Sequence, residues 1–90
     1  MIPPRIHLNG TSKQELLGNA EIACRAVNEA ISKLRQVYPN GRDYYPQRDS
    51  SALQKAAHQH CEMIRKLLAV QEELDALCLD ISNGGQSDAV

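Results

Sequence analysis

The chain has 90 residues, a formal net charge of −1 and only three aromatic residues, all of them tyrosines. This length allows one domain at most, and the near-neutral charge excludes a general polyanion binder and a disordered acidic protein. A core of Leu, Ile, Val and Ala without Phe or Trp is small for this length, and small domains often depend on oligomerisation, metals or disulfides.

The first ten residues are expected to form an extended arm. Pro3 and Pro4 exclude a helix there, and Ile6 and Leu8 are expected to lie against one. The segment contains no apolar core of a signal peptide, and no run in the chain approaches the roughly 18 apolar residues of a membrane span. We therefore expect a cytoplasmic protein that has no membrane partner.

A first helix is expected over about residues 12–38. Ser12 and Glu15 have the spacing of a capping box, with Thr11 as an alternative cap in a shifted register. Apolar residues then recur at spacings of three and four, which places them on one face of a helix. They are Leu17, Ala20, Cys24, Val27, Ile31, Leu34 and Tyr38. A second row with a spacing of seven widens this face and consists of Leu16, Ala23, Ala30 and Val37.

A loop is expected over residues 39–50, because Pro39 and Asn40-Gly41 are turn signals. All three tyrosines lie at this tip beside basic residues, and Tyr and Arg are frequent anchors of recognition surfaces. The candidate binding residues are therefore Tyr38, Arg42, Tyr44, Tyr45 and Arg48. Alternatively, the tyrosines fill the open end of a helical bundle and the neighbouring Arg and Asp residues pair locally.

A second helix is expected over about residues 51–81, followed by a disordered tail over 82–90. Ser51 and Gln54 match a second capping box, with Asp49 and Ser50 as alternative starts. The main apolar row consists of Leu53, Ala57, Ile64, Leu67, Leu74, Cys78 and Ile81. A second row beside it consists of Ala56, Met63, Val70 and Leu77. Cys61 and Leu68 widen the apolar arc on the other side of the main row.

Two polar residues, His60 and Gln71, interrupt the main row of the second helix. A polar residue between packed helices needs a hydrogen-bond partner, or it costs roughly 1–3 kcal/mol. Such residues can fix the register or the oligomeric state of a bundle. The alternative is that the helices separate enough at these positions to admit water.

The three cysteines, Cys24, Cys61 and Cys78, are not expected to form a disulfide framework because their number is odd. In an antiparallel hairpin Cys24 should lie opposite about residue 66, roughly one helical turn from Cys61 and too far for bridging. We therefore expect small, buried, reduced side chains in a reducing compartment.

No pattern of catalytic residues is present. The sequence contains no Gly-rich phosphate loop, no nucleophile elbow and no pair of acids placed to face a cleft, so we expect neither an enzyme nor a cofactor. The nearest approach to a metal or redox site is His58 with Cys61 and Glu62. His58 and Glu62 share one helix face, but His60 points nearly opposite to His58, so no metal site is expected.

Two segments of the chain resemble a known group of proteins. They are the loop Pro39-Asn40-Gly41-Arg42-Asp43-Tyr44-Tyr45-Pro46 and the segment Leu8-Asn9-Gly10-Thr11-Ser12 before the first helix. In these segments the chain resembles a group of small bacterial, often prophage-associated, helical proteins of unassigned function. The resemblance spans about residues 6–81 and implies a helical hairpin with an origin in a phage or mobile element. It carries over no catalytic or binding residue.

The predicted fold is all-α, an antiparallel hairpin of two long helices with an extended N-terminal arm, forming a single domain over residues 1–81. Both apolar arcs are wider than one neighbouring helix requires, which predicts a homodimer that forms a four-helix bundle. The expected contact residues of that dimer are Ala56, Met63, Val70, Leu77, Leu16 and Val37.

For function, the sequence favours a non-enzymatic structural or protein-interaction module, such as an accessory protein of a phage, whose tip contacts another protein. The alternative is a small nucleic-acid-associated protein that uses the basic, tyrosine-bearing tip. Residues 33–55 carry a net charge of +3 and the rest of the chain carries −4. This small basic excess favours a protein partner over nucleic acid.

Overall fold

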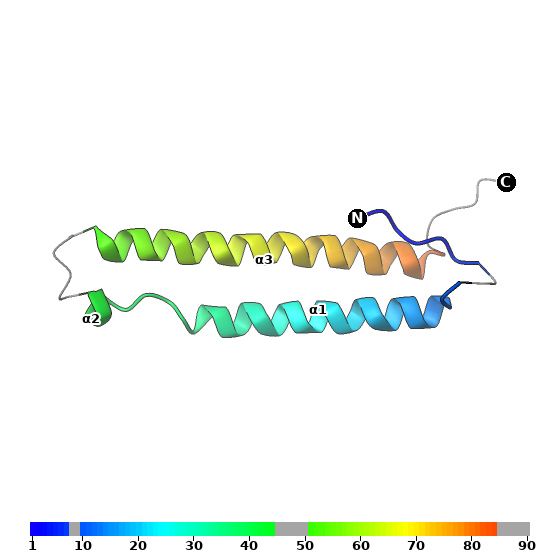
Figure 1. Cartoon of the computed structure of the whole chain (residues 1–90), viewed down its shortest axis with the longest axis horizontal. Helices are drawn as coiled ribbons and strands as arrows, with labels where there is room; N and C mark the ends of the chain where they lie inside the picture. The colour runs from blue at the N-terminus through cyan, green and yellow to red at the C-terminus, as the bar shows by residue number, and fades with distance from the viewer. Residues whose placement is uncertain (8–9, 45–50, 85–90) are drawn as a thin grey trace.

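The computed structural model describes residues 1–7, 10–44 and 51–84. It contains the long helices α1 (Lys13–Arg35) and α3 (Ala52–Ser82) and a short helix α2 (Gly41–Tyr44). α1 and α3 lie side by side and antiparallel in a rod of 65 × 21 × 16 Å (Figure 1). The predicted all-α hairpin is therefore confirmed. Among the described residues, no helix is long and apolar enough to cross a membrane.

α1 begins where the local cap signal places it. Ser12 has extended backbone dihedrals, and its hydroxyl oxygen accepts a hydrogen bond of 3.1 Å from the backbone N–H of Glu15. This bond satisfies one of the first N–H groups of the helix, which have no partner within it. Ser12 rather than Thr11 is thus the N-cap.

α1 ends at Arg35, three residues earlier than the apolar spacing predicts. The N–H groups of Gln36 and Val37 bond to the carbonyls of Lys33 and Leu34, three residues back, and tighten the final turn. Tyr38 precedes Pro39, and a residue before proline is disfavoured in the helical region. Val37 and Tyr38 therefore follow the helix although they continue its apolar pattern.

The chain does not reverse directly after α1. The side-chain oxygen of Asn40 accepts a 2.9 Å hydrogen bond from the N–H of Arg42, and its carbonyl accepts one of 3.0 Å from Asp43. These bonds start α2, which sequence reasoning assigned to a loop. α2 lies beside the start of α3, where Gly41 faces Leu53 (Figure 1). The segment after Arg35 therefore continues along α3 as far as Tyr44.

α3 begins at Ala52 without the predicted capping box. Ser51 has helical dihedrals (φ −94°, ψ 0°) and its side chain makes no capping hydrogen bond, because a capping residue requires an extended conformation. Asp49 and Ser50 lie outside the described residues. The predicted stop is present at the other end, where Gly84 has a φ of +100° and its N–H bonds to the carbonyl of Ile81 at 3.0 Å.

The buried core is small. In the described part of the chain only four apolar residues are more than nine-tenths buried: Ala20, Ile31, Leu77 and Ile81. Three of them, Ala20, Leu77 and Ile81, form one cluster near the start of α1 and the end of α3. The accessible surface is 7066 Å², whereas a compact monomer of this mass exposes about 5,200 Å². The hairpin alone therefore exposes more surface than a compact monomer of its mass.

The N-terminal arm folds back onto this end of the hairpin (Figure 1). Met1, Ile2 and Pro4 line a hollow of about 370 Å³ on the groove between the two long helices. Its helical walls include Leu16, Ala20, Ala23, Leu74, Leu77 and Ile81. Leu8 lies outside the described residues. Pro4 and Ile6 are half-buried, whereas Met1 and Ile2 remain 83% and 78% exposed, so the arm covers this end of the apolar surface only in part.

Candidate functional site

The second apolar rows of the two long helices lie on the same side of the hairpin. Leu16 and Ala23 from α1 and Leu77 from α3 line one hollow, and each row continues from there at a spacing of seven. We call this surface the apolar face. From the first half of the chain it contains Leu16, Ala23 and Ala30 on α1 and Val37, which follows α1. From α3 it contains Ala56, Met63, Val70 and Leu77.

The apolar face is covered at one end and open along the rest. Leu77 belongs to the buried core of the single chain, and Leu16 packs against that core, so neither leaves much surface for a partner. Beyond the arm the face is exposed, with Met63 at 46%, Val70 at 42% and Val37 at 66% of their full exposure. Ala30 is exposed and Ala56 is half-buried.

The opposite side of the hairpin differs in composition. There α1 presents a polar row, formed by Glu21, Asn28 and Arg35, all of them exposed. The side-chain amide of Gln71 donates a hydrogen bond to the side-chain oxygen of Asn28 across this side. On this side α3 presents one apolar residue, Leu68, which is 39% exposed, but the row that α1 presents beside it is polar. Of these two sides, as far as the structure describes them, the apolar face is the one with apolar rows on both helices.

Charge is distributed unevenly along the rod. In the half that contains the tip, residues 32–44 and 51–67, six basic side chains outnumber two acidic ones, for a net charge of +4. In the half that contains the arm, the described residues 1–7, 10–31 and 68–84 carry three basic and seven acidic side chains, for −4. Lys66, Glu73 and Asp80 each follow a member of the apolar face by three positions and therefore border it. The border is basic near the tip and acidic near the arm.

His60 and Gln71, the two polar residues in the main row of α3, both have partners within the hairpin. His60 is 6% exposed, and its Nε2 donates a 2.7 Å hydrogen bond to the carbonyl oxygen of Leu34 in the last turn of α1. Its ring also meets the edge of Tyr38 at 5.4 Å and 84°. The same carbonyl also accepts the N–H of Val37, so His60 supplies it with a second donor. This bond ties α3 to the last turn of α1.

The predicted tip residues are only partly brought together. Tyr38 is exposed apart from its contact with His60, Arg42 is exposed on α2, and Tyr44 is half-buried. Tyr45 and Arg48 lie outside the described residues. The structure therefore places two of the five candidates, Tyr38 and Arg42, on an exposed surface.

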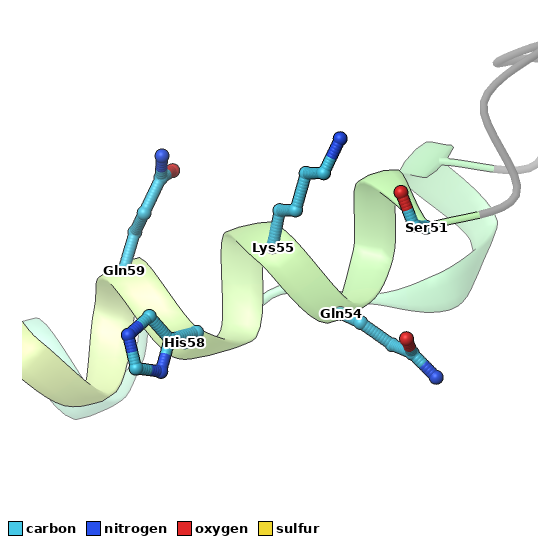
Figure 2. Close-up of a pocket in the computed structure, with 5 residues that line it drawn as sticks. All are labelled: Ser51, Gln54, Lys55, His58 and Gln59. Carbon is cyan, nitrogen blue, oxygen red and sulfur yellow. The ribbon is translucent and has the colours of Figure 1, made fainter.

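A second hollow lies on the first turns of α3 and is lined by Ser51, Gln54, Lys55, His58 and Gln59. Figure 2 shows Lys55 and Gln59 extending to one side of the helix and Gln54 and His58 to the other. The described residues that line it are Ser51 and residues of the first turns of α3, so among the described residues no group from a second element faces His58 across it. This arrangement does not resemble a catalytic constellation, which needs converging groups.

The residues considered as metal ligands do not converge either. In residues 1–7, 10–44 and 51–84 no group of three or more His, Cys, Asp or Glu side chains could hold a metal ion. Glu62 instead forms an ion pair with Arg65 on the same helix, with 2.9 Å between Glu62 Oε1 and Arg65 Nη1. Cys61 is exposed.

The cysteine positions overturn one expectation. The Sγ atoms of Cys24 and Cys78 are 3.6 Å apart, although the sequence analysis placed Cys24 opposite residue 66. That placement assumed a reversal soon after Tyr38, whereas the chain continues along α3 through α2 and so shifts the register of the hairpin. Burial, with the neighbouring Cys78 and then Asp75, raises the pKa of the Cys24 thiol to about 11.

No family model, no curated protein and no solved structure matches this chain. The resemblance to prophage-associated helical proteins therefore remains a prediction, and the functional argument depends on the residues themselves.

Proposed function

We propose that this protein is a non-enzymatic interaction module that self-associates through its apolar face. The observation that carries the proposal is a contrast among the described residues: four apolar residues are buried, while the apolar face stays exposed at Val37, Met63 and Val70. Exposed apolar surfaces that extend over several residues are typical of protein interfaces. A second hairpin supplies a surface of matching length and composition, and two hairpins make a four-helix bundle.

The charges favour a head-to-tail arrangement of the two copies. The tip half carries +4 and the arm half −4 among the described residues, so antiparallel copies place opposite charges beside each other. Parallel copies would place like charges together, which is unfavourable. Each rod end then keeps Tyr38 and Arg42 as a surface for a further protein.

The concentration and salt dependence of unfolding test this proposal. Because a dimer is stabilised by mass action, its thermal midpoint should rise when the protein concentration is raised about 100-fold. Head-to-tail pairing should weaken as the salt concentration rises from about 0.05 M to 0.5 M, since the Debye length shortens from more than 10 Å to less than 5 Å.

Two results would contradict parts of the proposal separately. A midpoint that does not change with concentration would remove self-association. A dimer that is strengthened by salt would keep self-association but reverse the orientation, because salt then screens repulsion between like ends.

The basic tip half supports a second candidate, a nucleic-acid-associated protein, with Tyr38 exposed for stacking. Binding of a fluorescent single-stranded DNA would then be strong at low salt and fall steeply as salt is added. The absence of binding at low salt would exclude this candidate.

A further inference from the structure

Two thiols meet across the hairpin at contact distance. Cys24 belongs to α1 and Cys78 to α3, 54 positions later, and their Sγ atoms are 3.6 Å apart. Both side chains are half-buried and both are free thiols. A disulfide requires about 2.05 Å between the sulfur atoms, so a small approach of the two side chains is enough.

We propose that Cys24 and Cys78 form a reversible disulfide that joins α1 to α3. A hydroperoxide is the chemical class of oxidant. One thiolate attacks the peroxide oxygen, the O–O bond breaks, and the cysteine becomes a sulfenic acid with release of one water. The second thiol attacks that sulfur and displaces its hydroxyl as a second water, which forms the S–S bond. Two thiols and one hydrogen peroxide thus give one disulfide and two waters.

The third cysteine is excluded by position. Cys61 lies on α3, 17 positions before Cys78, which corresponds to roughly 25 Å along one helix. It is also exposed, whereas the pair is partly covered. Cys61 therefore serves as an internal control in the same chain.

The neighbourhood of the pair sets the rate of the reaction. The groups that face Cys24 from α3 are Cys78 and Asp75, whose carboxylate oxygen lies 3.8 Å from Cys24 Sγ. Burial first, then these two neighbours, raise the pKa of Cys24 to about 11, so this thiol is protonated at neutral pH. Because the thiolate is the reactive form, attack by Cys24 itself should be slow at pH 7 and should accelerate as the pH rises towards 11.

The disulfide would close a long loop, because the 54 positions from Cys24 to Cys78 include the end of α1, the whole tip and most of α3. Cross-links that close long loops restrict the unfolded chain most, so the oxidised protein should have a thermal midpoint higher by roughly 10 °C or more. The pair contacts Asp75 on the side away from Met63 and Val70, so its formation does not depend on the proposed self-association.

The test is oxidation of the folded, full-length protein with hydrogen peroxide, followed by alkylation and peptide mass analysis. Trypsin cleaves after Lys13, Arg25, Lys55, Arg65 and Lys66, and so places the three cysteines in separate peptides, 14–25, 56–65 and 67–90. We expect a linked pair of peptides 14–25 and 67–90, an alkylated Cys61, a higher thermal midpoint, and reversal by dithiothreitol.

Variants separate this disulfide from other oxidation. Cys61→Ser should oxidise like the wild type, whereas Cys24→Ser and Cys78→Ser should each lose the linked peptide and the gain in midpoint. Three alkylated cysteines after oxidation of wild-type protein that remains folded by circular dichroism would overturn the proposal. A linked peptide that contains residues 56–65 would overturn it as well.

Discussion

Replacing Met63 and Val70 by glutamate is expected to convert the proposed dimer into a monomer. Both side chains are nearly half-exposed in the single hairpin and lie on the open part of the apolar face. Burial of an aliphatic side chain contributes about 1.5–3 kcal/mol, and a symmetric dimer loses two such contacts for each substitution. The glutamates would also be desolvated without a partner. The dissociation constant should therefore rise by at least about 100-fold, measured by sedimentation equilibrium.

Leu68→Glu is the matched control for this variant. Leu68 lies on the same helix, between the two substituted positions, and has a similar exposure of 39%. It faces the other side of the hairpin, where α1 is polar, so the control should remain a dimer. Equal dissociation by Leu68→Glu would show that the apolar face is not the interface.

Ile81→Ala is expected to destabilise the fold by about 2–5 kcal/mol, the usual range for removing a buried aliphatic side chain. Ile81 is 2% exposed, which makes it the most buried apolar residue in the described part of the chain. It packs with Ala20 and Leu77 at the end that also holds the arm. With so few buried residues, the core has little other packing to compensate. Urea unfolding at one fixed protein concentration measures the loss.

Leu79→Ala provides the comparison for Ile81→Ala. Leu79 lies two positions earlier on the same helix, has a side chain of the same size and is 61% exposed. Its truncation should change the free energy of unfolding by less than about 0.5 kcal/mol, as for most surface positions. Equal losses in the two variants would mean that burial in the hairpin does not determine stability at this end.

Features set by short-range chemistry could be predicted from the sequence. The cap at Ser12 depends on residues three positions apart, and the stop near Gly84 depends on a single glycine. The apolar spacing likewise predicts two long helices that pack through their main rows. These features succeed because helix caps and helix periodicity act within one or two turns of the chain.

Features that depend on where the chain reverses could not be predicted in the same way. The apolar pattern continues through Val37 and Tyr38 and therefore predicts a helix end at about residue 38, whereas Pro39 favours the earlier end at Arg35. Asn40 is a favourable N-cap residue and could have indicated α2, but a turn and a helix start share this signal. Without α2 the register was misplaced, and the contact between Cys24 and Cys78 was missed.

The candidate site was predicted in part. Periodicity identified the outward rows that contain Met63 and Val70, but it could not show that the arm covers one end or that Leu77 serves the core. That distinction requires the relative rotation of the two helices, which no local pattern contains. The tip residues were selected by residue type alone, and for Tyr38 the structure adds a ring contact with His60.

The most direct test of the proposed self-association is the solution mass of the wild-type protein, measured by light scattering during size exclusion in low salt. An interface on the apolar face predicts twice the 10.0 kDa mass of one chain at micromolar concentration and above. A mass of one chain across the whole concentration range would contradict it.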